Sequence, residues 1–327
     1  MFDSINETIE ALAKLIPSRE KEDVANLDDI FEQIKLLSQH KLKYIYETGW
    51  KRLDEKLHIT PSILLLAGSG GTGKTSFITA MMKKLLSRHN DIAICWVIID
   101  HESARSTMNK FLQMDLHLTL EELMGIGRKM NEMDINAIMA LKESYKEYDI
   151  VYHRGNRDIS DIRKKFRLFC LERKEKFNIL IIDNVMQLED HFNGKIKGNQ
   201  TTIDDFITHE IASIYKENSS SNCLIIPIHH LTKEKQKQSL DEAYEPKREH
   251  IKGSSRWDDV PEKILLINSP GIYPDLVRNY PGHEEILQHL FIVNFAKNTF
   301  GKMGYDYFWV YPEYNIYEEI EEINNKL

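Results

Sequence analysis

The glycine-rich stretch Gly68–Thr75 (GSGGTGKT) has the composition and spacing of a phosphate-binding loop. It follows an apolar run of strand type and opens a run of helical period, which is the setting that a G-x-x-x-x-G-K-[ST] loop requires. Its glycines allow consecutive backbone N–H groups to turn towards phosphate oxygens. The N-terminal end of the following helix adds a partial positive charge at the same place. The stretch therefore predicts a site for the phosphates of a nucleotide.

Two side chains at the end of this loop have separate expected roles. Lys74 is placed to reach the β- and γ-phosphates, and Thr75 to set its hydroxyl on a Mg²⁺ ion. A carboxylate for the same ion is predicted at Asp183, which directly follows the apolar run Asn178–Ile182 and can bind Mg²⁺ through water. The residues expected to contact ATP in the loop are Gly68, Gly70, Gly71, Thr72, Gly73, Lys74, Thr75 and Ser76.

Hydrolysis also needs a group that orients or deprotonates water, and two carboxylates compete for that role. Asp100 and Glu102 both follow the apolar run Ile92–Ile99, and either could serve as a general base. Both remain open at this point, since acids are also common at helix starts. His230 follows the apolar run Cys223–Ile228 and could sense the γ-phosphate. Zinc is not expected, because no Cys or His partners stand at ligand spacing.

The elements that must position these groups are visible as short apolar runs that alternate with helical periods. Strands are expected over Ser62–Ala67, Ile92–Ile99, Asp149–His153, Asn178–Ile182, Cys223–Ile228, Lys263–Asn268, Leu290–Lys297 and Tyr305–Pro312. Helices are expected over Lys74–Ser87, Ser103–Phe111, Asp158–Arg173 and Thr202–Tyr215. This pattern predicts an α/β fold whose mostly parallel central sheet is covered by helices on both faces. The last three runs lack long helices between them, so antiparallel strands are expected at the C-terminal end.

The first 48 residues differ from the rest in composition. They are polar and helical in pattern, as in INETIEALAKLI, and they lack the apolar surface for a core of their own. The chain is therefore expected to consist of a helical N-terminal extension over 1–48 and a main domain over 49–327. We expect the extension to pack on the main domain or on a neighbouring subunit.

The overall composition limits the class of protein. Hydrophobic residues make up 42% of the chain and charged residues 29%, which is typical of a globular protein. There is no run of eighteen apolar residues and no signal-peptide pattern at the N-terminus, so no membrane partner is expected. The 3 cysteines lie far apart in the sequence, which favours buried, reduced thiols and a cytoplasmic location.

The charge distribution points to local rather than general binding of anions. The formal net charge of -8 argues against a broadly basic surface. The positive residues nevertheless cluster in three stretches, 193–200, 232–238 and 246–253. Such stretches can be solvated loops, but they can also bind nucleic acid, because binding depends on where the charge sits.

From about Thr48 to Glu319 the sequence resembles the RecA-like ATPase core of DnaB-type hexameric replicative helicases and of plasmid RepA-type helicases. The segments that carry the resemblance are TGWKRLDEKL, GSGGTGKT, IDHESARSTMNKFL, ILIIDNVMQL, IIPIHHLTK and IKGSSRWDDVPEKILLI. The resemblance implies a RecA-like P-loop NTPase fold and hydrolysis of ATP with Mg²⁺. It also selects Glu102 over Asp100 as the catalytic base.

The same resemblance assigns further residues and partners. Gln187 matches a nucleotide-site residue of the strand segment, and His230 matches the phosphate sensor of RepA-like and some phage members. ATP would lie between the subunits of a homo-oligomer, expected to be a hexameric ring, with single-stranded DNA on central loops. The loop residues assigned to DNA are Lys195, Lys197, Lys233, Lys235, Lys237, Lys247, Arg248, Lys252 and Gly253.

The stretch FAKNTFG is similar to a family segment in which a lysine and an arginine reach the neighbour's nucleotide. Lys297 matches the lysine, but Thr299 stands where the arginine is expected. An arginine supplied in trans accelerates phosphoryl transfer by roughly 10³–10⁵-fold. Lys297 could therefore act alone, Arg256 could substitute, or turnover could be slow and depend on a partner.

Two hypotheses about the function follow from these predictions. The first is an ATP-dependent DNA helicase or translocase that works in replication or in a mobile element, with a possible loader or primase-like partner. The second is a nucleotide-gated regulatory ATPase that binds DNA or a partner and hydrolyses ATP slowly. A third hypothesis, a small-molecule kinase, has less support. A kinase would need an acceptor pocket and a lid, whereas this chain has loops that match DNA-binding positions of the similar family.

Overall fold

The computed structural model describes most of the chain after residue 44. The described residues are 45–99, 104–188, 200–231, 246–251, 256–273, 277–278, 281–299 and 301–320, without the side chains of 200–204. They belong to one compact unit, Tyr44–Leu327. The expected helical extension over 1–48 lies almost entirely outside the described residues, so its helices and its boundary stay predictions.

Within the described residues, the strands form one nine-stranded sheet in the order β3-β2-β4-β5-β1-β6-β7-β8-β9. Their bounds are β1 Ser62–Gly68, β2 Ile92–Ile98, β3 Asp149–Arg154, β4 Phe177–Asp183, β5 Cys223–His230, β6 Lys263–Asn268, β7 Leu290–Asn298, β8 Gly304–Tyr311 and β9 Ile316–Glu319. The six strands from β3 to β6 pair in parallel, whereas β7, β8 and β9 are antiparallel to their neighbours. The predicted α/β fold with antiparallel strands at the C-terminal end is confirmed.

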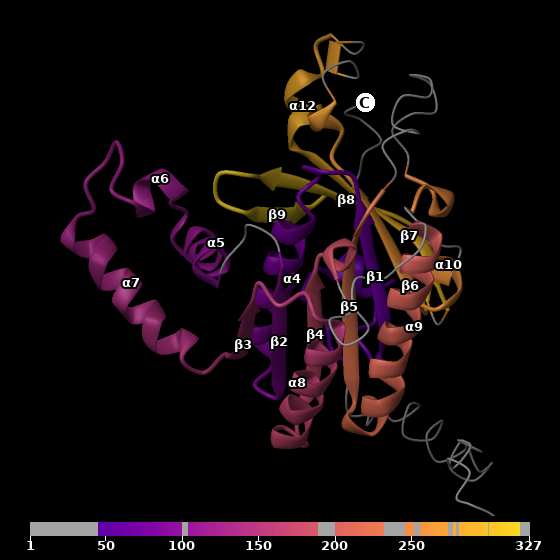
Figure 1. The fold of residues 1–327 in the computed structure, drawn as a ribbon. Helices are drawn as coiled ribbons and strands as arrows, with labels where there is room; N and C mark the ends of the chain where they lie inside the picture. The colour runs from indigo at the N-terminus through magenta and orange to yellow at the C-terminus, as the bar shows by residue number, and fades with distance from the viewer. Residues whose placement is uncertain are drawn as a thin grey trace, which may run out of the picture. The chain divides into compact units, whose positions relative to one another are not determined.

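Helices cover both faces of the parallel strands (Figure 1). The α-helices are α3 Lys51–Asp54, α4 Lys74–Arg88, α5 Ala104–Leu116, α6 Leu120–Leu123, α7 Glu132–Tyr145, α8 Ile159–Glu172, α9 Gln200–Asn218, α10 Arg256–Asp259 and α12 Glu284–His289. One face carries α4 and α5, and the opposite face carries α8 and α9. Within the described residues, no helix has the length and apolar content that a membrane span requires.

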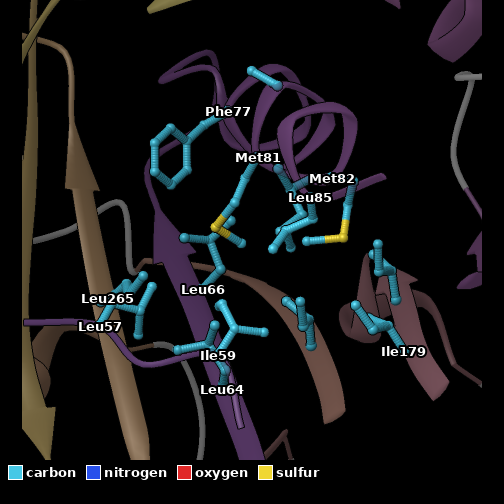
Figure 2. Close-up of a cluster of buried hydrophobic side chains, with 14 of the residues drawn as sticks. Leu57, Ile59, Leu64, Leu66, Phe77, Met81, Met82, Leu85, Ile179 and Leu265 are labelled. Carbon is cyan, nitrogen blue, oxygen red and sulfur yellow. The ribbon is translucent and has the colours of Figure 1, made fainter. Parts of the chain in front are cut away.

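The two hydrophobic cores follow the alternation of side chains along the strands. In β1, Leu64 and Leu66 point to the core under α4, while Ile63 and Leu65 point to the core under α8 and α9. Figure 2 shows Met81 of α4 packed over Leu66. All three cysteines are buried, as expected. Strands that are apolar on both faces are typical of a parallel sheet between helical layers.

An aromatic cluster connects the helix after the phosphate loop to the antiparallel strands. The rings of Trp50 and Phe77 stack with centroids 5.5 Å apart, and Phe77 lies 5.1 Å from Phe291 of β7. Tyr317 of β9 packs against Phe77 at 5.6 Å, and its carbonyl oxygen accepts a hydrogen bond from the Trp50 indole. Since α4 begins at the phosphate loop, this cluster fixes the loop relative to the C-terminal strands.

Two elements differ from the sequence-based expectation. The sequence pattern predicts no strand after 305–312, but Ile316–Glu319 pairs with β8 and Tyr317 is buried in the aromatic cluster. Helix α7 is absent from the predicted helices, and no side chain of its 14 residues is buried. Its start is nevertheless well defined, because Asn131 and Asp134 form a capping box. In Figure 1, α6 and α7 reach away from the sheet.

Candidate active site

The phosphate loop runs between β1 and α4, as its sequence predicts. Gly71 and Gly73 have positive φ angles of 80° and 84°, which residues with a side chain rarely adopt. Gly73 is the N-cap of α4, so its position in the left-handed region starts the helix directly after the turn. The first N–H groups of α4 therefore face the space where a phosphate would bind.

Lys74 is held inside the loop. Its ammonium donates hydrogen bonds to the carbonyl oxygens of Gly68, at 3.0 Å, and Ser69, at 2.7 Å. Only 7% of the residue is exposed. Burial lowers the pKa of Lys74 to about 8, against a smaller opposing effect of the Asp183 carboxylate. An anionic phosphate at this position would offset the lost hydration and favour the charged form.

Thr75 and Asp183 lie side by side although 108 residues separate them. The Thr75 hydroxyl donates to Oδ2 of Asp183 at 2.6 Å, because β4 ends next to β5, which pairs with β1. A hydroxyl and a carboxylate are hard oxygen donors of the kind that Mg²⁺ prefers. The described residues hold no cluster of three or more His, Cys, Asp or Glu side chains suited to a metal. Thr75 and Asp183 are the two described side chains that could lie beside such an ion.

His230, at the end of β5, lies between two donors. Its Nδ1 is 3.2 Å from the ammonium of Lys74, and its Nε2 is 3.3 Å from Nδ2 of Asn184. The Asn184 amide is oriented by its own oxygen, which accepts from the backbone N–H of Met186 at 3.1 Å. The amide therefore presents its NH₂ group to the imidazole.

A neutral imidazole can accept only one of these two hydrogen bonds. When Asn184 donates to Nε2, the ring proton sits on Nδ1 and faces the Lys74 ammonium. A phosphate oxygen near Lys74 would resolve this conflict, since the lysine could bind the oxygen and Nδ1–H of His230 could donate to it. The arrangement therefore suits a ring that responds to the terminal phosphate. Asn184 was missed at the sequence level, although its position directly after Asp183 is the signal that could have found it.

The catalytic base expected at Glu102 lies in 100–103, outside the described residues, and so does Asp100. The residues on both sides are informative. Ile98 pairs with Asp183, and the backbone N–H of Ile99 donates to the Asp183 carbonyl oxygen at 2.8 Å. The chain therefore leaves β2 beside the residue that is expected to face Mg²⁺, and it re-enters described structure at Ala104 of α5.

The other expected site residues are spread over the same edge of the sheet. Gln187 is half-buried in the short 3-10 helix η1 Val185–Gln187, one turn after Asp183. Lys247 and Arg248 are exposed at the start of a second short helix, η4 Arg248–His250. A bridge between Leu231 and Ile251 holds this segment at the end of β5. The expected DNA-contacting residues outside the described residues are Lys195, Lys197, Lys233, Lys235, Lys237, Lys252 and Gly253.

Lys297 is remote from the phosphate loop of its own chain. It pairs with Ile264 on β6, whereas Gly68 pairs with Ile267, so the two levels differ by about 10 Å along the strands. The Lys297 ammonium donates to the carbonyl oxygens of Asp258, at 2.7 Å, and Asp259, at 2.9 Å. Within one chain, Lys297 therefore caps the end of α10.

Thr299 and Arg256 also make contacts within the chain. The Thr299 hydroxyl donates to the carbonyl oxygen of Glu262 at 2.9 Å. Arg256 lies 3.5 Å from the Asp205 carboxylate on α9. These contacts join Thr299 to the residue before β6 and Arg256 to α9.

Comparison with known proteins agrees with this geometry. Residues 46–315 match the model of the family described as DnaB-like helicase C terminal domain. The structure resembles a solved structure described as an ATPase domain, with a TM-score of 0.76 and 16% identity over 91% of this chain and 100% of that chain. It also resembles a DnaB-like replicative helicase described with its interactions with primase, with a TM-score of 0.74 and 17% identity over 98% and 73% of the two chains. No curated protein sequence matches the chain.

The family match covers well over half of the chain, so the protein belongs to the DnaB-like helicase C-terminal domain family. Its RecA-like core is the fold of the two solved structures. The protein is therefore an ATP-hydrolysing helicase motor of the DnaB type, as its sequence indicates.

The lowered pKa of Lys74 gives a testable dependence of nucleotide affinity on pH. Without nucleotide, Lys74 loses its proton above about pH 8. Bound phosphate keeps the ammonium charged, so above this pH the protein must take up a proton when it binds ATP. We expect the dissociation constant for ATP, measured by titration calorimetry, to be about tenfold larger at pH 9 than at pH 7. In Lys74→Arg the guanidinium stays charged, so whatever affinity remains should not fall in this way. A wild-type affinity that is constant up to pH 9 would contradict the assignment.

Proposed function

We propose that the chain is the subunit of an oligomeric, ATP-dependent DNA translocase that hydrolyses ATP between subunits. The observation that carries the proposal is the grouping of Lys74, Thr75, Asp183 and His230 within hydrogen-bond distance at one edge of the sheet. These groups come from β1–α4, β4 and β5, and they offer a cation, a hydroxyl, a carboxylate and an imidazole. That set suits the binding and cleavage of a nucleoside triphosphate.

In the proposed site, each side chain acts on a different part of ATP. Lys74 exchanges its carbonyl partners for β- and γ-phosphate oxygens. Thr75 and Asp183 would hold Mg²⁺, and the ion would supply charge that neutralises the phosphate oxygens. Gln187 lies one turn beyond Asp183, after the end of β4, and is the remaining proposed nucleotide-binding side chain there.

Glu102 is the proposed general base. It accepts a proton from a water molecule whose oxygen forms a bond to the γ-phosphorus, while the bond from that phosphorus to the β,γ-bridging oxygen breaks and ADP leaves. His230 donates to the γ-phosphate before the reaction and loses this acceptor when phosphate departs. Asn184 keeps the imidazole proton on the nitrogen that faces the phosphate.

The site is proposed to be completed by a second copy of the chain. Lys297 lies at a different level of the sheet from its own loop, which supports a role in a neighbour's site. To act there, its ammonium would have to exchange the carbonyl oxygens of Asp258 and Asp259 for phosphate oxygens.

Single-stranded DNA is the proposed track. Lys247 and Arg248 are exposed next to the end of β5, and the segments 193–200 and 232–238 carry further lysines. Contacts from lysine and arginine to phosphates provide most of the non-specific affinity for nucleic acid. An acidic exterior with a basic channel would reconcile this role with the net charge of -8.

An exposed apolar surface supports assembly through the N-terminal extension. On α6, α7 and the residues beside them, Met124 is 52% exposed, Ile126 55%, Met133 80% and Met139 53%. Contiguous exposed apolar side chains usually mark a contact site, and these four lie on successive segments of the chain. The amphipathic stretch Ile5–Ile16 of a neighbouring copy is the proposed occupant, because it lacks a core of its own. The proposed assembly is a hexameric ring, and a loader or primase-like protein is a proposed further partner.

A second candidate function is a regulatory ATPase with slow hydrolysis. It is favoured by Thr299 at the position of the expected arginine and by the bonds of Lys297 within its own chain. The histidine at position 230 resembles plasmid and phage members, which supports a mobile-element setting for either function.

Turnover measurements with and without DNA test the proposal. Lys74→Ala is expected to abolish ATP binding, because the lysine is the main cation of the loop. Glu102→Gln is expected to bind ATP and lose at least about a hundredfold in kcat, since the amide cannot accept the proton. ATP hydrolysis by the wild type should rise when oligo(dT) is added.

Normal hydrolysis by Glu102→Gln would show that the base is another group. Asp100→Asn is the matched variant, because it removes the competing carboxylate two residues earlier. Wild-type turnover that ignores DNA would favour the regulatory function over translocation.

The mass of the assembly tests the proposed contact between subunits. Met139→Glu places a charge on the exposed face of α7 and is expected to convert the oligomer into monomers in a light-scattering measurement. Leu168→Glu, on α8, is the control, because Leu168 is 60% exposed but lies on a different helix. Equal masses for the wild type and Met139→Glu would contradict docking on α7.

A further inference from the structure

One face of the antiparallel strands carries a row of aromatic side chains that the nucleotide site does not use. Along β8, Tyr305, Tyr307, Trp309 and Tyr311 alternate with the buried residues between them. Successive side chains of a strand point to opposite faces, so these four rings share the face turned away from the aromatic core. All four are partly exposed. We call this row the aromatic ladder.

Contacts within the ladder keep its rings in ordered positions. The rings of Tyr305 and Tyr307 are nearly parallel, with centroids 6.3 Å apart and planes inclined by 23°. The His289 imidazole stacks on Trp309 at 5.0 Å and 10°, and its Nδ1 lies 2.6 Å from the Val310 carbonyl oxygen. Ordered rings offer a flat contact surface at a low cost in conformational entropy.

A basic segment lies against one end of the ladder. Asn294 pairs with Tyr305 across β7 and β8, and its amide donates to the Pro246 carbonyl oxygen at 3.4 Å. Pro246 is followed directly by the exposed residues Lys247 and Arg248. The same segment closes on the end of β5 through the bridge at Ile251. Rings and cations from distant parts of the sequence therefore meet at the Tyr305 end.

The charges around the ladder differ between its two ends. Glu318 of β9 pairs with Trp309 and is exposed on the same face. Arg248 is partly neutralised by Asp258, to which its guanidinium donates a hydrogen bond. Lys247 is therefore the main cation for a phosphate near Tyr305, whereas the carboxylate at the other end disfavours one. A polyanion would therefore place its charged groups near Lys247 at the Tyr305 end and its uncharged groups along the rings towards Trp309.

We infer that the aromatic ladder is a base-stacking surface for single-stranded nucleic acid, with Tyr305 and Tyr307 stacking on bases and Lys247 binding the adjoining phosphate. The inference rests on the proposed DNA-dependent motor and adds a contact that the basic loops do not supply. Those loops carry few aromatic residues and suit the phosphate backbone. Rings that stack on bases beside a cationic strip that follows the backbone form the usual combination for binding without sequence preference.

The tryptophans provide a direct test in the full chain. Trp50, Trp96 and Trp257 are 3%, 0% and 1% exposed, so Trp309 is the only partly exposed one of the 4 in the sequence, all of which the structure describes. Titration with oligo(dT) is expected to quench the intrinsic fluorescence, because a base stacks on or beside this ring. Trp309→Phe should abolish the quenching and keep the affinity within about threefold, since phenylalanine retains an aromatic face.

Substitutions separate stacking from charge. Tyr305→Leu combined with Tyr307→Leu is expected to weaken oligo(dT) binding by about tenfold or more. The slope of log K against log salt should not change, because the rings release no counterions. Lys247→Ala should reduce that slope by about one. Tyr152→Leu, at a half-buried tyrosine of the distant edge strand β3, is the matched control, and Tyr305→Phe should bind like the wild type.

The outcomes distinguish failure of the aromatic ladder as a DNA surface from failure of the proposed DNA-dependent motor. If oligo(dT) binds and Lys247→Ala weakens it, but the tyrosine variants bind normally, the ladder is not a DNA surface and the proposed motor stands. Fluorescence that changes with protein concentration and not with DNA would assign the ladder to a protein contact instead. If the wild type binds no oligo(dT), both the inference and the proposed function are wrong.

Discussion

The nucleotide site depends on a buried lysine, Lys74. Main-chain carbonyl oxygens accept its hydrogen bonds, and a bound anion would replace them. Lys74 loses most of its hydration at the start of α4, and the carbonyl oxygens of Gly68 and Ser69 replace that hydration only in part. The resulting fall in its pKa expresses how strongly the site favours a nearby negative charge. The parallel strands bring a carboxylate and an imidazole to the same place.

The sheet changes from parallel to antiparallel pairing after β6, and this change separates two groups of side chains. The six parallel strands bring their carboxyl ends to one edge, where Asp183 and His230 meet the loop. The antiparallel strands run back along the sheet and carry Lys297 to a level about 10 Å from the loop. The aromatic cluster around Phe77 keeps the two regions in fixed relation. One chain can thus present a nucleotide loop at one level and a cation at another, which suits a site shared between copies.

The sequence predicted the parts of this arrangement that rest on local patterns. The phosphate loop, the eight expected strands and the parallel-to-antiparallel change follow from glycine spacing and apolar runs. The contact between Thr75 and Asp183 could be anticipated only from the requirement that Mg²⁺ has two ligands. β9 could not, because Ile316–Glu319 is a short, half-acidic stretch that becomes a strand only through pairing with β8. Asn184 was missed because its role depends on a hydrogen bond to an imidazole 46 residues away.

The most direct test of a shared site is complementation between two inactive variants. Lys74→Ala removes the cation of a subunit's own loop, and Lys297→Ala removes the cation that the subunit offers to its neighbour. If each site is built from two copies, a mixed assembly contains sites with an intact Lys74 from one variant and an intact Lys297 from the other. With a shared site, ATP hydrolysis is nearly absent in either variant alone and is expected to reappear on mixing. A mixture no more active than the sum of its parts, or full activity of Lys297→Ala by itself, would contradict it.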